Sequence, residues 1–225
     1  MVESIKSLEC ACLTTEEYGN KAVNLSKLNS VVSVPKGIAI GKSSYKINNF
    51  ESAVQQALCK IPIVGKRYCI RSSSSKEDGQ KTYAGMLRSE VNVSEEELFE
   101  SIDRVKKSYS NIPENYDNSN HSIIPVVVQE YLDFDIGGVC FTRHPVTNEK
   151  VYYIEMDNSP KEVVSGNSIP TTLHLEKNKN YTGLENLLKR TFEKIDKIYS
   201  RPQDIEWGCV NDTVFVVQTR DITTL

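Results

Sequence analysis

The sequence predicts an α+β protein of two lobes, and three observations lead to that prediction. Helical and strand-like patterns are mixed through the first half of the 225-residue chain. The second half reads as an antiparallel meander, a long helix and a closing hairpin. Residues 110–122 between the halves are polar, rich in turn-forming residues and without apolar periodicity. We therefore expect an N-terminal lobe at 1–112, a linker at 113–120 and a C-terminal lobe at 121–225.

The first lobe is expected to combine helices with short strands. Apolar residues recur at helical spacing over 16–28, and threonines that suit a helix cap come just before them. Ser94 and Glu97 form a capping box in front of a second apolar stripe, which predicts a helix from 95 to about 108. The other expected elements are a short extended segment at 31–40, a helix at 51–60, a short strand ending at Arg71 and a strand ending near Val93.

The second lobe is expected to be built on an antiparallel meander. Three strands, at 123–132, 137–142 and 151–156, follow one another with short connections between them, and we expect them to pair in that order. A short strand at 171–175 comes next. Apolar residues on one side of 182–199 then predict the longest helix of the chain.

The closing hairpin carries the strongest chemical signal. Its first strand alternates carboxylates with large apolar residues over 204–207, and its second strand, 214–220, ends in two polar residues that are two positions apart. Asn211 and Asp212 suit the turn between them. We expect one face of the hairpin to carry four polar side chains: Asp204, Glu206, Gln218 and Arg220.

These residue types suit a nucleotide triphosphate. Two carboxylates and an amide oxygen match the ligand preference of a hard cation such as Mg²⁺. An arginine beside them matches a phosphate. The same pattern taken alone also describes an amphipathic edge hairpin with a solvated charged face.

Two positions in the first lobe fit the same chemistry. Arg71 runs into the serines at 72–75, which predicts either a plain solvent loop or a loop that surrounds a phosphate with hydroxyl and N–H donors. Lys21 lies near the start of a predicted helix, where an anion would also meet free backbone N–H groups. The alternative for Lys21 is an ordinary surface lysine.

Composition excludes several other classes. A net charge of −3 gives no basic footprint, so nucleic acid is not favoured as a partner. No apolar run approaches the ~18 residues that span a bilayer, and charges in the first 12 residues break any signal-peptide core. The six cysteines and three histidines show neither a disulfide framework nor zinc-site spacing. We therefore expect a cytoplasmic protein with reduced cysteines and no membrane partner.

Four groups of segments resemble one known family in order and rough spacing, from residue 19 to residue 221. They are Gly19–Leu25 with Val34–Gly37, Arg71–Ser74 with Ala84–Met86 and Asn92–Val93, Val127–Gln129 with Gly138–Thr142 and Pro145, and Asp204–Trp207 with Gln218–Arg220. Together they resemble the N-terminal ATP-binding (PEP/pyruvate-binding) domain of phosphoenolpyruvate synthase and pyruvate phosphate dikinase, which rifampicin phosphotransferase shares. The resemblance implies a two-lobed, ATP-grasp-like fold with the antiparallel sheet in the C-terminal lobe.

The resemblance also implies ATP and Mg²⁺ as cofactors and assigns roles residue by residue. Lys21, Arg71 and Arg220 would hold the phosphates and assist the transfer. The loop residues Gly85 and Ser89 would lie over the phosphates, and Gln129 would lie near the adenine. Glu206 and Gln218 would bind Mg²⁺, with Asp204 beside them.

The chain departs from the family pattern in two places. The family's Trp-Gly-Leu-Gly-Glu segment corresponds to 157–166, where only the final Val163–Gly166 is retained, and this affects the acceptor side more than the ATP site. The phospho-accepting histidine domain of the full-length enzymes has no counterpart here. We interpret His121, His144 and His174 as surface or packing residues.

Three functions follow from the resemblance. The first is an ATP-dependent phosphotransferase that phosphorylates a histidine on a separate swivelling domain or partner protein. The second is a small-molecule kinase or ligase that binds its acceptor directly. The third is a nucleotide-binding module without catalysis. Retention of the charged positions favours the first two, and the chain is also compatible with being one part of a longer enzyme.

Overall fold

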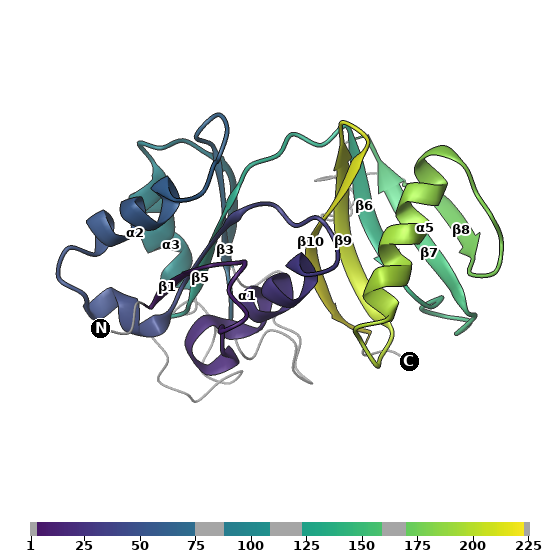
Figure 1. Ribbon diagram of the computed structural model, residues 1–225, viewed down its shortest axis with the longest axis horizontal. Helices are drawn as coiled ribbons and strands as arrows, with labels where there is room; N and C mark the ends of the chain where they lie inside the picture. Colours follow the sequence, from purple (N-terminus) through teal and green to yellow (C-terminus); the bar gives the residue numbers. More distant parts are fainter. Residues whose placement is uncertain (1–3, 75–87, 109–122, 159–169, 223–225) are drawn as a thin grey trace. The chain divides into compact units, whose positions relative to one another are not determined.

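The chain folds into two compact units. The computed structural model describes residues 4–74, 88–108, 123–158 and 170–222. One unit comprises Met1–Lys27 and Pro35–Tyr131, and the other comprises Leu28–Val34 and Leu132–Leu225. The expected linker at 113–120 lies outside the described residues. Each unit contains a five-stranded sheet whose neighbouring strands are antiparallel (Figure 1).

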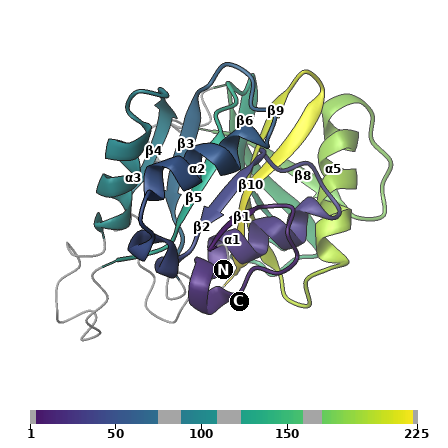
Figure 2. The same ribbon diagram turned by 60° about the vertical axis from the view of Figure 1, so that its left-hand side comes forward.

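The sheet of the first unit has the strand order β1-β2-β5-β3-β4. The strands are β1 (Ile5–Ser7), β2 (Gly37–Ile40), β3 (Tyr68–Ser72), β4 (Ser89–Val93) and β5 (Val126–Glu130). Helices α2 (Phe50–Cys59) and α3 (Leu98–Lys106) cover one face: α2 contacts β1 and β2, whereas α3 contacts β3, β4 and β5 (Figure 2). A short 3₁₀ helix, η1 (Lys42–Lys46), precedes α2. The core between the helices and this face includes Val54 and Ile102 from the helices and Ile38, Ile70 and Val128 from the strands.

The remaining helix of this unit, α1 (Thr15–Asn29), confirms the helix expected at 16–28. Ala22, Leu25 and Leu28 are fully buried, as their helical spacing predicts. Gly19 interrupts the helical backbone with φ 76° and ψ 170°. Figure 1 shows α1 on the opposite side of the sheet from α2 and α3.

The capping box is confirmed in part. Glu97 accepts hydrogen bonds from the backbone N–H and the hydroxyl of Ser94, at 3.3 and 2.9 Å. Residues 95–97 form a turn, and regular helix begins at Leu98. Both hydrogen bonds run from Ser94 to Glu97, and they order the entrance to α3 rather than its first helical turn.

The assignment of 123–132 to the C-terminal meander was wrong. Strand β5 lies between β2 and β3 in the sheet of the first unit. The meander of the second unit consists of β6 (Ile136–Phe141), β7 (Val151–Asp157) and β8 (Thr171–Glu176). Val126, Val127 and Val128 are all fully buried, so both faces of β5 are covered. A strand that is apolar on both faces suits the centre of a sheet, and β2 and β3 provide the two neighbours that it needs.

The sheet of the second unit has the strand order β10-β9-β6-β7-β8. The strands are β6 (Ile136–Phe141), β7 (Val151–Asp157), β8 (Thr171–Glu176), β9 (Gln203–Val210) and β10 (Thr213–Asp221). Helix α5 (Gly183–Asp196) packs on one face, where Leu188, Phe192 and Ile195 are fully buried. The Phe192 ring lies 5.7 Å from Tyr152 and 6.4 Å from Trp207, measured between ring centroids. The other face carries polar and apolar side chains together, since Val139 and Phe141 of β6 lie opposite Glu206 and Asp204 of β9.

The prediction that every cysteine is reduced was wrong for one pair. Cys10 and Cys12 form a disulfide with their Cα atoms 5.2 Å apart, whereas Cys59, Cys69, Cys140 and Cys209 form no disulfide within the described ranges. A Cys-x-Cys pair in a turn can meet this distance without help from the rest of the fold. Within the described ranges, no helix is both long and apolar enough to cross a membrane.

Candidate nucleotide site

The β9–β10 hairpin confirms the predicted face. Asn211 and Asp212 form the turn with φ angles of 49° and 54°, the left-handed backbone that a tight hairpin requires. Arg220 lies opposite Asp204, and Gln218 lies opposite Glu206. Directly opposed residues of antiparallel strands point to the same face, so these four side chains share one side of the sheet.

A β-bulge makes this arrangement possible. The register shifts between Val216 and Gln218, so that Val217 is an extra residue on β10. With an unbroken register from the turn, Gln218 would oppose Ile205, whose side chain is fully buried on the α5 side. The bulge therefore turns the amide and the guanidinium toward the two carboxylates.

Asp204 is held by the arginine opposite it. The Nε and Nη2 atoms of Arg220 both donate to Oδ2 of Asp204, at 2.8 and 2.7 Å. The Asp204 side chain is only 12% exposed. Burial raises the pKa of Asp204 despite Arg220, and the charge of Glu206 raises it further. A further positive charge besides Arg220 would therefore stabilise the ionised form of Asp204.

Gln203 is a polar residue of this region that the sequence reasoning missed. It is fully buried, and its Nε2 donates to Oδ1 of Asp221 at 2.7 Å. Its Oε1 accepts from Thr219 at 3.0 Å, and its backbone N–H donates to the hydroxyl of Thr142 at 2.9 Å. Gln203 therefore ties together the ends of three strands beside Asp204 and Arg220. The only sequence signal is an amide at the start of a strand, which is too common to be read as functional.

In the first unit, three of the expected residues lie on the face of the sheet opposite α2 and α3. Arg71 on β3 pairs with Ser89 on β4 and with Val127 on β5, so these side chains share a face. Gln129 lies two residues beyond Val127 and therefore points the same way. It is buried, and its Nε2 donates to the Pro35 carbonyl at 3.0 Å.

A close approach between α1 and the end of β3 brings Lys21 to the serine run. A Cβ built on Gly19 would lie 1.6 Å from the carbonyl oxygen of Ser73. The Ser73 hydroxyl accepts from the Ala22 N–H at 3.0 Å and donates to the Tyr18 carbonyl at 2.7 Å. Lys21, between these anchored residues, is 7% exposed, so the alternative of an ordinary surface lysine was wrong.

The serine run is likewise not a plain solvent loop over its described part. Ser72, Ser73 and Ser74 are all buried. The rest of the loop, including Gly85, lies outside the described residues. The structure thus gathers Lys21 and the serine run with β3 in one unit, and the four hairpin residues in the other.

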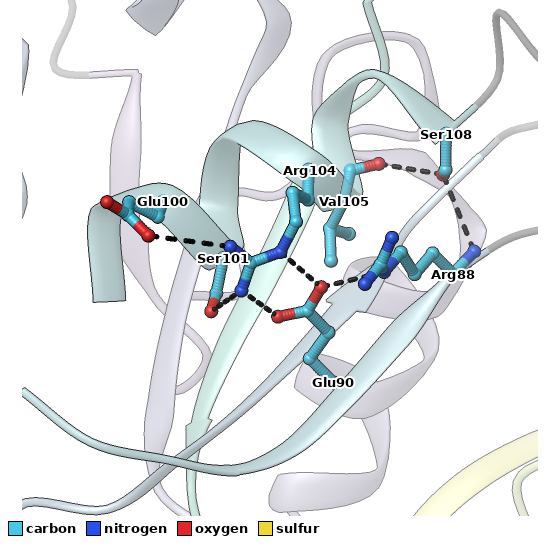
Figure 3. A network of polar contacts seen from close by, with 7 residues as sticks. All are labelled: Arg88, Glu90, Glu100, Ser101, Arg104, Val105 and Ser108. Atoms are coloured by element: carbon cyan, nitrogen blue, oxygen red, sulfur yellow. Dashed lines mark hydrogen bonds and ion pairs between the residues drawn. The ribbon is translucent and has the colours of Figure 1, made fainter. Parts of the chain in front are cut away.

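An ion network anchors the strand that carries Ser89. Glu90 accepts from Nε and Nη2 of Arg104 on α3, at 2.9 and 2.7 Å, and from Nε of Arg88 at 2.7 Å (Figure 3). The hydrogen bond from Arg104 is the largest cause that lowers the pKa of Glu90, to about 2. The contact with Arg104 therefore fixes edge strand β4 to α3 directly beside Ser89.

Comparison with known proteins identifies the family. Residues 47–186 match the family described as "Pyruvate phosphate dikinase, AMP/ATP-binding domain". This match includes Arg71, Ser89 and Gln129, whereas Lys21 and the hairpin lie outside it.

Curated relatives agree with this match. Probable phosphoenolpyruvate synthases of Methanothermobacter thermautotrophicus and Archaeoglobus fulgidus are 30% and 26% identical over 69% of this chain. Rifampicin phosphotransferase of Bacillus cereus is 24% identical over the whole chain. The chain spans only 27 to 33% of the length of these relatives.

Solved structures give the fold. D-alanine–D-alanine ligase of Bacillus anthracis, complexed with ATP, is similar with a TM-score of 0.53 at 12% identity, over 91% of this chain and 53% of that one. The Helicobacter pylori ligase gives a TM-score of 0.52 at 12% identity, over 92% of this chain and 55% of that one. The fold is therefore α+β and ATP-grasp-like, as the resemblance implied. Because the family match covers more than half of its residues, the chain belongs to the pyruvate phosphate dikinase AMP/ATP-binding domain family.

Proposed function

We propose that this chain binds Mg-ATP and transfers a phosphoryl group from it to an acceptor. The observation that carries the proposal is the bulged hairpin, which places Glu206 and Gln218 opposite each other, with Asp204 and Arg220 as the next pair on the same face. Carboxylate and amide oxygens beside a guanidinium are the groups expected where a divalent cation meets phosphate.

The hairpin residues fit Mg²⁺ in number and kind. Mg²⁺ is commonly held by one or two carboxylates, with water and substrate phosphates completing its shell. Within the described ranges, no cluster of three or more His, Cys, Asp or Glu is placed to hold a metal. We assign Glu206 and Gln218 as ligands, with Asp204 alongside. When bound, Mg²⁺ would neutralise charge on the phosphates.

Three cations of the chain would position the triphosphate. Lys21 is buried next to the anchored serine run, Arg71 extends from β3, and Arg220 is oriented by Asp204. Phosphoryl transfer depends on positioning and charge stabilisation more than on covalent chemistry, so such an arrangement can supply most of the catalysis. Gly85 and Ser89 would cover the phosphates, and Gln129 would lie near the adenine.

For the acceptor, we favour a histidine on a separate swivelling domain or partner protein. The chain spans about a third or less of the length of these relatives, which therefore contain segments beyond the part that it matches. A small molecule is the second candidate, because the relative that matches the whole chain is named for transfer to rifampicin. A reaction that consumes Mg-ATP fits the cytoplasm.

Isothermal titration calorimetry with ATP and a non-hydrolysable analogue, with and without Mg²⁺, tests the nucleotide site. We expect Mg²⁺-dependent binding that Glu206→Ala weakens by about 10- to 100-fold. Glu155→Ala is the matched control. Glu155 on β7 and Glu206 on β9 both lie opposite Val139 of β6, so the two carboxylates share one face of the sheet but are two strands apart. Failure of the wild-type chain to bind any adenine nucleotide would refute the proposal.

The acceptor is tested separately by phosphate transfer from labelled ATP. We expect label to appear on a phosphohistidine domain from a full-length relative, and not on that domain with its histidine replaced by alanine. Label on a free metabolite in the absence of any protein partner would instead establish the second candidate.

A further inference from the structure

The disulfide between Cys10 and Cys12 lies in the segment that joins β1 to α1. Its neighbours Leu8 and Leu13 are buried, at 1% and 8% exposure, so the core holds both ends of the segment. Cys12 is exposed and Cys10 is partly exposed. The sulfur atoms are thus presented at the surface of a segment whose ends are fixed.

This bond contributes little to holding the fold together. A disulfide restricts the unfolded chain more strongly when it closes a longer loop, and the separation here is only two residues. For the same reason the two thiols stay close together after reduction, so the bond can re-form within the molecule. An accessible disulfide of this kind is open to attack by an external thiolate.

The other cysteines differ from this pair. Cys140 and Cys209 are buried, and burial raises the pKa of both thiols, which disfavours the reactive thiolate. Cys59 is exposed but has no disulfide partner. Cys69 is partly buried and also forms no disulfide. Within the described ranges, Cys10 and Cys12 are thus the cysteines that combine a bonded sulfur partner with exposure at the surface.

The segment is also bonded to α1, the helix that carries Lys21. The Ser26 hydroxyl donates to the Cys10 carbonyl at 2.8 Å, and the Cys10 N–H donates to the Ser7 carbonyl at 3.0 Å. The Cys12 N–H also donates a hydrogen bond to the Cys10 sulfur, with an N–Sγ distance of 3.4 Å. A change at the sulfurs therefore acts on a turn that is tied to both β1 and α1.

We propose that Cys10 and Cys12 form a thiol–disulfide exchange site whose redox state alters how the 9–12 segment docks on α1. The thiolate of an external thiol such as glutathione attacks one sulfur, which releases the other as a thiolate and forms a mixed disulfide. A second external thiolate then attacks the external sulfur of that mixed disulfide and frees the first cysteine. Two electrons and two protons pass to the pair, and the two external thiols become one disulfide; a disulfide oxidant reverses the reaction.

The exchange is tested on the full chain in glutathione buffers from reduced to oxidised, followed by acid quenching, alkylation and peptide mass spectrometry. As the buffer becomes more oxidising, we expect the peptide that contains residues 10 and 12 to change in a single transition. Both cysteines should be alkylated at the reduced end and joined by a disulfide at the oxidised end, and neither should carry glutathione. Cys59 is the internal control, because a lone exposed thiol should take up glutathione instead. The proposal is overturned if the pair stays reduced throughout, takes up glutathione as Cys59 does, or stays bridged at the reduced end.

The effect on α1 is read by hydrogen–deuterium exchange of its backbone amides. We expect amides around Ser26 to exchange several-fold faster in the reduced state. A chain with Cys10→Ser and Cys12→Ser should show no response to the redox buffer. Equal exchange of the α1 amides in both redox states of the wild type would refute the proposed effect of the disulfide on docking of the 9–12 segment. Neither the mass spectrometry nor the hydrogen–deuterium exchange depends on nucleotide binding.

Discussion

Gly19→Ala should detach α1 from the end of β3. The native backbone at Gly19, φ 76° and ψ 170°, is one that only glycine adopts readily. The new Cβ would also lie 1.6 Å from the Ser73 carbonyl oxygen, whereas real Cβ atoms essentially never come within 3.0 Å of another atom. The helix and the serine run must therefore move apart by roughly 1 to 2 Å, since backbone atoms cannot overlap.

The cost has two parts. Forcing a non-glycine residue into this backbone region costs on the order of 1–3 kcal/mol. Separation also breaks the buried hydrogen bonds that Ser73 makes to Ala22 and Tyr18, at about 1 kcal/mol each. We therefore expect a loss of about 4 kcal/mol in the free energy of unfolding of the first unit, a large part of the 5–15 kcal/mol that is usual for a domain.

Gly65→Ala is the matched control. Gly65 has φ 80°, also in the left-handed region, but a Cβ there would have no neighbour within 4 Å. Its substitution should cost only the backbone strain, about 1–2 kcal/mol. Urea unfolding followed by circular dichroism gives the total effect, and hydrogen exchange of the α1 amides localises it. The single tryptophan, Trp207, lies in the second unit, so its fluorescence reports that unit independently.

The reasoning is refuted if Gly19→Ala destabilises the chain no more than Gly65→Ala. It is also refuted if α1 amides exchange at wild-type rates in Gly19→Ala. Either result would mean that α1 does not depend on the close approach to Ser73, and that Lys21 is positioned in another way.

Three further predictions concern the hairpin and the network around Glu90. Deleting Val217 should remove the bulge yet leave Gln218 opposite Glu206 and Arg220 opposite Asp204, so Mg²⁺-dependent nucleotide binding should be retained; its loss in calorimetry would contradict the register argument. Asp204→Asn should leave the thermal midpoint equal or higher, because burial disfavours this charge, yet weaken nucleotide binding about 10-fold or more; a clear drop in midpoint would contradict the argument. Glu90→Gln should destabilise the first unit by about 1–2 kcal/mol at neutral pH, a value reduced for the exposure of its arginine partners. Because the folded pKa of Glu90, about 2, lies below its ordinary value of 4.5, its contribution is complete above about pH 4.5 and is lost as the pH falls toward 2. Acid unfolding curves of the two proteins should therefore converge at low pH, and a constant difference would disprove this linkage.

The sequence allowed the chemistry of the hairpin to be predicted because alternation is a local property. Asp204 and Glu206 are two residues apart, and so are Gln218 and Arg220, which places each pair on one face of its own strand. Whether the two pairs share a face depends on the register between strands. That register follows from the bulge at Val217, in a run of valine and phenylalanine with no local mark of an extra residue.

The error at β5 has a related cause. Three consecutive valines followed by Gln129 predict a buried strand but contain no alternation, so nothing local specifies which sheet the strand joins. The partners of β5 are separated from it by tens of residues in sequence, at β2 and β3. Assigning it to the strand that follows in the chain was the simplest choice, and long-range pairing overrode it.

The burial of Lys21 excludes one of the two interpretations that the sequence leaves open, an ordinary surface lysine. A lysine in the first turns of a helix is normally exposed, and the same residue type at 7% exposure needs a reason to be there. Here the reason is indirect, since Gly19 removes the side chain that would keep the helix away from Ser73, and the serine hydroxyl then bonds both Tyr18 and Ala22. The position of the lysine is therefore set by its uncharged neighbours. A search for cationic residues alone would find Lys21, but the contact between Gly19 and Ser73 explains why its backbone lies beside the end of β3.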